Sequence, residues 1–78
     1  MTLNDLTAGE YGVITRIELD EKTKQKLFDM GVCEGTTIRF LRTAPLGDPI
    51  EFRALNFNLC IRKREAKMIF VERRSDLE

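Results

Sequence analysis

The sequence predicts an all-β fold, a small barrel of about five antiparallel strands, with one short α-helix after the first strand. Five segments show the alternation of apolar and polar residues that places one strand face inward. Glycine, proline and asparagine separate these segments, as tight turns require. One stretch, 20–31, instead has apolar residues at helical spacing. We expect the sheet to close on itself, because closure removes the exposed edges of a small sheet.

The length of the chain leaves room for one hydrophobic core. Its 78 residues are 42% hydrophobic and include five phenylalanines. A domain of this size buries only about 60% of the surface that its unfolded chain exposes. We therefore assign residues 1–74 to a single domain and expect residues 75–78 to form a frayed tail. The final pair, 77–78, is typical of an expression scar and carries no structural weight.

The N-terminal third predicts a lead-in turn and the first strand. Leu3 and Leu6 are expected to be buried at one end of the core. The segment Glu10–Leu19 is rich in valine and isoleucine, which favour a strand. Within it, Gly12 indicates a bulge or a point where another backbone approaches closely.

The helix follows this strand and has recognisable ends. Asp20 is a residue type that caps a helix N-terminus, and Gly31 suits the left-handed residue that ends one. Between them, Leu27 and Met30 lie at helical spacing and are expected to face the core. The lysines of this segment are interpreted as a solvated face.

Two strands and a stiff loop occupy the middle of the chain. Thr36–Arg42 and Ile50–Leu55 both alternate, and Ala44–Ile50 between them contains both prolines. Each proline fixes its own φ and restricts the residue before it, so this connection is rigid. It is either a plain hairpin connection or a surface that presents Leu46 to a partner.

The C-terminal part predicts a tight hairpin and the last strand. Asn56 tolerates positive φ, so a turn centred on Asn56 and Phe57 is expected. The remaining predicted elements are a strand at 59–62, a single helical turn at 63–67 and a strand at 68–72.

The composition of the chain argues against most kinds of catalysis and metal binding. Thirteen basic residues balance thirteen acidic ones, and there is no histidine to act as base, metal ligand or proton shuttle. We predict that the protein is not an enzyme and has no cofactor. Cys33 and Cys60 are too few for a soft-metal site, so no metal ligand is assigned; Cys60 is expected to pack as a small hydrophobe and Cys33 to be exposed.

Apolar residues exceed what the interior of so small a fold needs. The surplus set is Leu41, Leu46, Leu55, Phe57, Met68 and Phe70. Exposed apolar groups mark an interaction surface only where they cluster. An alternative is a small RNA-binding barrel that uses the basic run 62–64, although the neutral net charge favours a protein partner.

The pattern of these residues along the chain resembles the FeoA family, ferrous iron transport protein A. Its most specific part is the loop 44–49, Ala-Pro-Leu-Gly-Asp-Pro, followed by Arg62, Glu65 and Ala66 in an Arg-x-x-Glu-Ala pattern. Leucines and glycines before the first strand and around the helix add to it. The resemblance extends from about Leu3 to Glu72.

The resemblance implies an SH3-like β-barrel in the cytoplasm that contacts FeoB, the membrane ferrous iron permease, and modulates its GTP-binding domain. No apolar run long enough for membrane insertion and no signal peptide is seen in the sequence. The same domain type is appended to metal-dependent repressors, so a transition-metal-sensing regulatory role is the alternative, and weak homo-oligomerisation is left open. The residues assigned to partner binding are Pro45, Leu46, Gly47, Asp48, Pro49, Leu55 and Phe57.

Overall fold

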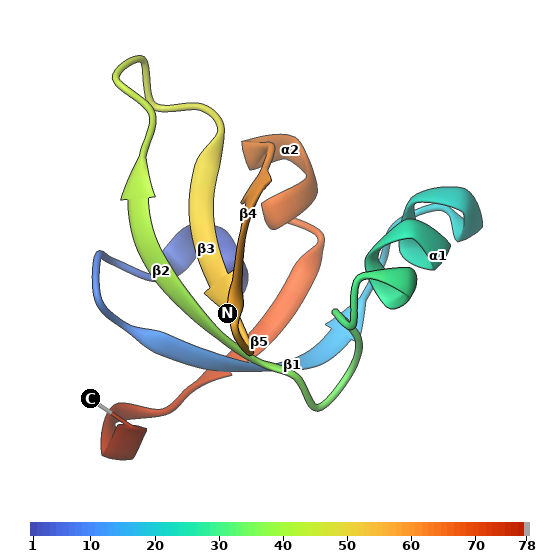
Figure 1. Ribbon diagram of the computed structural model, residues 1–78, viewed down its shortest axis with the longest axis horizontal. Helices are drawn as coiled ribbons and strands as arrows, with labels where there is room; N and C mark the ends of the chain where they lie inside the picture. The colour runs from blue at the N-terminus through green and yellow to red at the C-terminus, as the bar shows by residue number, and fades with distance from the viewer. Residues whose placement is uncertain (78) are drawn as a thin grey trace.

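The computed structural model describes residues 1–77 and contains one five-stranded antiparallel sheet with a helix beside it (Figure 1). In chain order the elements are the 3-10 turn Leu3–Asp5, β1 (Tyr11–Ile17), α1 (Glu21–Asp29), β2 (Thr37–Thr43), β3 (Ile50–Ala54), β4 (Phe57–Ile61), α2 (Lys63–Ala66), β5 (Ile69–Arg73) and the 3-10 turn Ser75–Leu77. The predicted fold class, a small antiparallel β fold with one helix after the first strand, is confirmed.

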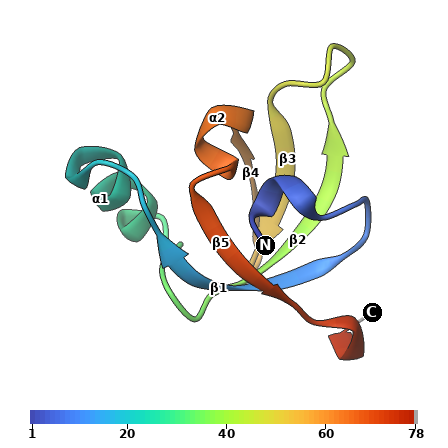
Figure 2. The ribbon, with the colours of Figure 1, turned by 180° about the vertical axis from the view of Figure 1, so that it is seen from behind.

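The sheet curls without closing. Its strand order is β4-β3-β2-β1-β5, and within residues 1–77 the two end strands do not pair with each other. The prediction of a sealed sheet is therefore wrong in this respect. The N-terminal segment protects the outer edge of β5 instead, because Thr2 bridges Phe70 and the Val71 amide donates to the Met1 carbonyl at 2.9 Å. Figure 2 shows this segment beside β5.

The inner face of the curled sheet forms one hydrophobic core. Leu3 and Leu6 are buried in it, as predicted. The rings of Phe40 and Phe52 meet edge to face, with their centroids 5.4 Å apart. This geometry is favourable for aromatic pairs and adds to the burial of apolar area. The two rings place the centre of the core between β2 and β3.

Gly12 marks a close approach between β1 and β5. A Cβ atom at this position would lie 3.1 Å from Cβ of Val71 and 3.3 Å from Cδ1 of Leu6. The sequence predicts the close approach of a backbone here, but the three nearest atoms belong to the side chains of Val71 and Leu6. The irregularity of β1 lies further along, between Ile14 and Arg16, where its register against β5 shifts.

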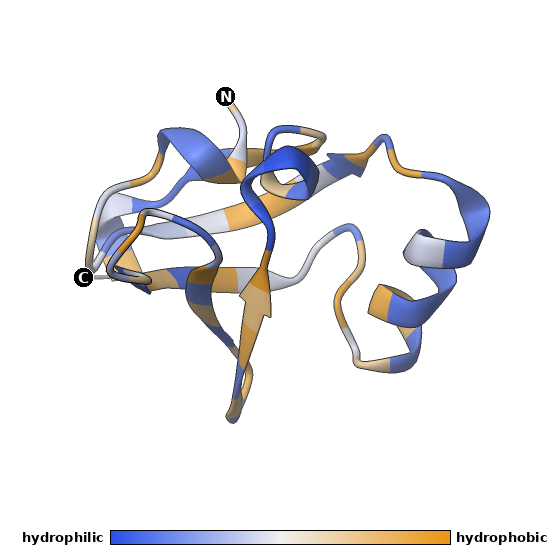
Figure 3. Ribbon diagram, turned by 90° about the horizontal axis from the view of Figure 1, so that it is seen from above, coloured by the Kyte–Doolittle hydropathy of each residue, from blue (hydrophilic) through white to orange (hydrophobic). Residues whose placement is uncertain are grey.

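Helix α1 is more exposed than its periodicity predicts. Leu27 packs against the edge of the core, but Met30 is 44% exposed and Phe28 is 61% exposed. Figure 3 shows α1 at one side of the sheet, with most of its ribbon coloured hydrophilic. The prediction that Met30 faces the core is therefore wrong.

The end of α1 explains why Met30 stays outside. Gly31 has φ +87°, and the amides of Gly31 and Val32 donate to the carbonyls of Phe28 and Leu27 at 2.9 and 2.8 Å. These two hydrogen bonds form a Schellman motif, which reverses the chain after the helix. The reversal turns Val32 inward, and Val32 is fully buried. At this end of the helix the residue buried in the core is therefore Val32, whereas the helical spacing predicts that it is Met30.

The β3–β4 hairpin turns one residue earlier than predicted. Its turn residues are Leu55 and Asn56, because Phe57 already pairs with Ala54 as the first residue of β4. Leu55, rather than Asn56, takes the positive φ, at +55°. A leucine in this left-handed region is strained.

The C-terminal residues up to 77 are partly ordered. Where the sequence predicts a frayed tail, Ser75–Leu77 form a 3-10 turn, and Arg74 pairs with Asp76 at 2.8 Å. Glu78 lies outside the described residues, so the predicted tail (75–78) and the predicted expression scar (77–78) are described only up to residue 77. Within residues 1–77, no helix has the length and apolar character needed to cross a membrane.

Acid is expected to loosen the start of α1. The hydroxyl and amide of Thr23 donate to the Asp20 carboxylate at 2.7 and 3.2 Å, and these hydrogen bonds lower the pKa of Asp20 below its ordinary value of 3.8. A lowered pKa in the folded state means that the ionised cap stabilises the helix above about pH 4 and that this contribution is lost as the pH falls through the lowered pKa. NMR titration of the Asp20 carboxyl and of the amides in the first helical turn measures both effects.

The control is Asp20→Asn, which keeps an accepting side-chain oxygen and cannot titrate. Its first-turn amides should show no transition in the same acidic range. An Asp20 pKa at or above the ordinary value would contradict the cap.

Candidate functional site

The loop 44–49 between β2 and β3 is held by its own backbone. The Ala44 amide donates to the Pro49 carbonyl at 2.9 Å, and the Gly47 amide donates to the Ala44 carbonyl at 2.7 Å. Gly47 has φ +91°, which glycine adopts without strain. The Asp48–Pro49 peptide bond is cis. These hydrogen bonds, together with Pro45 and Pro49, give the loop the defined shape that the sequence predicts.

Asp48 ties the loop to the rest of the fold. Its Oδ1 accepts a hydrogen bond from the backbone amide of Lys63 at 3.0 Å, at the first residue of α2. The first amides of a helix have no partner within the helix, so the carboxylate satisfies one of them. The loop and the start of α2 are thereby linked across the surface.

Leu46 occupies the tip of this loop. Its side chain is 97% exposed. Single exposed leucines are common on protein surfaces, so exposure alone assigns no role. The distinguishing feature here is that a hydrogen-bonded backbone sets the position from which the side chain projects, which lowers the backbone entropy that a contact would cost.

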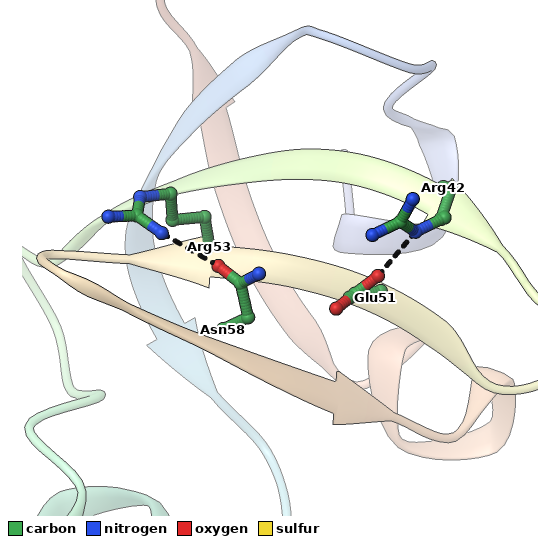
Figure 4. Close-up of polar contacts among 4 residues, drawn as sticks. All are labelled: Arg42, Glu51, Arg53 and Asn58. Carbon is green, nitrogen blue, oxygen red and sulfur yellow. Dashed lines mark hydrogen bonds and ion pairs between the residues drawn. The ribbon is translucent and has the colours of Figure 1, made fainter.

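A shallow pocket of about 200 Å³ lies at the base of the loop. Its lining residues are Arg42, Thr43, Ala44, Pro45, Pro49, Glu51 and Cys60. The prolines supply apolar walls, and Arg42 and Glu51 pair with each other across β2 and β3 (Figure 4). Apolar walls with a satisfied ion pair suit contact with another molecule.

The structure divides the predicted partner-binding residues into two groups. Pro45, Leu46, Gly47, Asp48 and Pro49 lie together in the loop that precedes β3. Leu55 and Phe57 lie in and just after the turn that follows β3, so the length of this strand separates them from the loop. Leu55 is 71% exposed, whereas Phe57 packs partly against the core. Of the surplus apolar side chains, Leu55 and Phe57 accordingly do not lie beside Leu46.

The two cysteines differ in exposure from the expected packing of Cys60 and the expected exposure of Cys33, although the alternation of β4 alone places Cys60 outward. Cys60 is exposed, because it pairs with Glu51 on the outer face of the sheet while its neighbours Leu59 and Ile61 point inward. Cys33 is half-buried, and its Sγ lies 3.7 Å from the Thr36 hydroxyl. Among residues 1–77, no three histidine, cysteine, aspartate or glutamate side chains come together as a metal site.

Sequence reasoning did not single out a row of residues on the outer face of the sheet. Tyr11, Arg39, Arg53 and Asn58 stand directly opposite one another on β1, β2, β3 and β4. The Arg39 guanidinium carbon lies 5.1 Å from the centroid of the Tyr11 ring, and Arg53 Nη1 donates to Asn58 Oδ1 at 3.0 Å (Figure 4). Alternation predicts that Arg53 points outward, but only the strand register shows which residues share a row.

A second pocket, of about 280 Å³, lies over this row. Its lining residues are Tyr11, Thr37, Arg39, Arg53 and Leu55. We call it the arginine pocket. The nearby carboxylate of Glu10 is already engaged: the Thr7 amide donates to it at 2.8 Å and Arg73 pairs with it at 3.2 Å. The hydrogen bond from Thr7, followed by the charge of Arg73, lowers the pKa of Glu10, so it stays ionised beside these partners.

Known proteins resemble this chain over nearly its whole length. The Fe(2+) transport protein A/Fe(2+) transporter FeoB fusion protein of Porphyromonas gingivalis is 35% identical over 72 residues, which are 92% of this chain and 8% of that relative. The chain therefore spans only a small part of that relative's length.

Solved structures of similar proteins share the fold. The solution structure of FeoA from Chlorobium tepidum is 37% identical, with a TM-score of 0.88, and the alignment covers 91% of this chain and 68% of that one. The zinc-complexed FeoA of Stenotrophomonas maltophilia, described as a prokaryotic SH3 domain protein, is 24% identical, with a TM-score of 0.76 and coverage of 92% and 89%. The likeness to this second structure supports the SH3-like fold.

The family match covers all five strands, both helices and the loop that carries Leu46. Residues 1–73 match the FeoA domain family. The resemblance drawn from the loop 44–49 is confirmed by this match, by the fused relative and by the Chlorobium tepidum structure. The chain belongs to the FeoA family.

Proposed function

We propose that this protein is a small accessory protein of ferrous iron uptake that acts by contact with the cytoplasmic part of a FeoB-like permease. The observation that carries the proposal is the Porphyromonas gingivalis relative, in which the matching region and a FeoB transporter form one chain. Fusion holds two parts at a high effective concentration, which is useful where the separate parts bind each other. The cytoplasm is the compartment in which such a contact would form.

The proposed contact is made by the loop 44–49. Its hydrogen bonds and its link to α2 hold Leu46 in place before any partner arrives. The pocket at its base adds apolar walls from Pro45 and Pro49. A preorganised apolar tip beside a concave surface is the arrangement expected of a binding hot spot.

The proposed action is binding without catalysis. The sequence has no histidine to serve as a general base. The loop pocket does contain the Cys60 thiol and the Glu51 carboxylate, but Glu51 is already paired with Arg42. Modulation of the GTP-binding domain of the permease through this contact is part of the proposal.

The direct test is binding of the purified protein to the isolated cytoplasmic part of the FeoB-like permease from the same organism. Isothermal titration calorimetry is run with no nucleotide, with GDP and with a non-hydrolysable GTP analogue. Saturable binding in at least one nucleotide state is the expected result. A permease fragment that binds guanine nucleotide normally but gives no heat with this protein in any state would overturn the proposal.

A further inference from the structure

The arginine pocket contains two positive charges that are carried by directly opposed residues of neighbouring strands. Arg39 of β2 and Arg53 of β3 are direct cross-strand partners, and within residues 1–77 neither forms an ion pair. Like charges in this position destabilise a sheet. The next outward pair along the same two strands, Arg42 and Glu51, has opposite charges and pairs internally (Figure 4). Of these two outward pairs between β2 and β3, only Arg39–Arg53 brings like charges together.

The side chains of these arginines are drawn apart. Arg39 lies over the Tyr11 ring and its Nε donates to the Gly9 carbonyl at 3.3 Å, on the β1 side. Arg53 is held by Asn58, on the β4 side. The hydrogen bonds fix both guanidinium groups at the two sides of the pocket of about 280 Å³. Two anchored guanidinium groups around a shallow cavity are suited to binding a carboxylate.

Leu55 supplies an apolar wall at the end of the same pocket. It is 71% exposed and has φ +55°, a conformation that glycine or asparagine adopts more easily. A strained and exposed leucine does not stabilise the fold through its own conformation. The two-residue hairpin turn requires the positive φ, so the unusual feature is that a leucine, and not glycine or asparagine, stands at this exposed position.

We propose that the arginine pocket receives an acidic side chain, aspartate or glutamate, from a segment of a protein partner in which an apolar residue stands beside the acidic one. The carboxylate binds between Arg39 and Arg53, and the apolar neighbour packs on Leu55. The inference is independent of the proposed contact through Leu46, because the two surfaces lie at opposite ends of β3.

The pocket favours a peptide over a nucleic acid. It offers two cations and one apolar wall, whereas a single-stranded nucleic acid needs a continuous positive groove with several stacking aromatics. The chain as a whole has no excess of positive charge. A short acidic-apolar segment matches the size and the chemistry of the site.

The test is an NMR titration of the intact protein with two blocked peptides, acetyl-Leu-Glu-Leu-amide and acetyl-Leu-Gln-Leu-amide. The glutamate peptide is expected to shift the Nε–Hε signals of Arg39 and Arg53 and to leave that of Arg42 in place. The glutamine peptide should shift neither. The double variant Arg39→Gln with Arg53→Gln should bind the glutamate peptide at least about tenfold more weakly.

The matched control is Arg42→Gln, which removes one positive charge from the same face and should leave peptide binding unchanged. A second variant, Leu55→Gly, relieves the positive φ, so its unfolding midpoint should not fall while its peptide affinity does. The proposal is overturned by no shift with the glutamate peptide, by equal shifts with both peptides, or by full binding in the double variant. It is equally overturned if inorganic phosphate or hexauridylate RNA shifts the two arginine signals at lower concentrations than the peptide.

Discussion

Replacing Leu46 by aspartate is expected to abolish binding to the cytoplasmic part of the permease and to leave the thermal unfolding midpoint unchanged. The side chain is 97% exposed, so its replacement removes almost no contact within the fold. Surface substitutions of this kind change stability by no more than about 0.5 kcal/mol. In the complex, however, a carboxylate would replace the apolar group at the centre of the contact and would be buried without a partner.

Calorimetry and thermal unfolding, measured on the same preparation, separate the two effects. Phe28→Asp is the matched control, because it places the same charge at another exposed apolar position, 61% exposed on α1. The control should bind the permease as the unaltered protein does. Binding of Leu46→Asp with unchanged affinity would show that the loop is not the contact surface.

Replacing Phe52 by alanine is expected to remove a large share of the free energy of unfolding of this domain. The Phe52 side chain is fully buried and contacts the Phe40 ring in the middle of the core. Removing a buried phenylalanine costs about 3–5 kcal/mol, because the cavity closes only in part. A domain of 78 residues has a total stability of roughly 4–12 kcal/mol, so the loss is a large share of it.

Urea denaturation followed by circular dichroism measures this loss as a lower unfolding midpoint. Phe28→Ala removes the same group from an exposed position on α1 and should change the midpoint little. An unchanged midpoint in Phe52→Ala would mean that the core is not centred between β2 and β3.

Local alternation was sufficient to predict which face of β3 lies inside. Ile50, Phe52 and Ala54 of β3 were expected on one face, and all three are buried. Glu51 and Arg53 occupy the other face, which is the outer one. The period of two fixes this choice without knowledge of the neighbouring strands, because successive side chains point to opposite sides.

Tertiary placement could not be predicted in the same way. The helical spacing of Leu27 and Met30 shows that they share a side of α1, but it carries no information on how near that side comes to the sheet. The reversal at Gly31 decides this distance and gives the buried position to Val32. Periodicity describes a helix face, whereas burial depends on the chain that follows the helix.

The arginine pocket could not be predicted from the sequence, because its residues come together only through the register of neighbouring strands. Arg39 and Arg53 are separated by a loop and by a register shift between Phe40 and Arg42, and either feature changes which residues oppose each other. A shift by one residue would place a charge opposite a buried side chain. The candidate site in the loop could be predicted because its residues are contiguous, but the row across four strands could not.

The position of Cys60 makes the loop pocket accessible to covalent labelling. Its thiol is exposed at the rim of the pocket formed with Pro45 and Pro49, whereas Cys33 is half-buried beside Thr36. A maleimide fluorophore should therefore react first at Cys60 and lie in the pocket at the base of the loop that carries Leu46, without a new cysteine being introduced. The native chain thus carries its own attachment point for an optical reporter of partner docking.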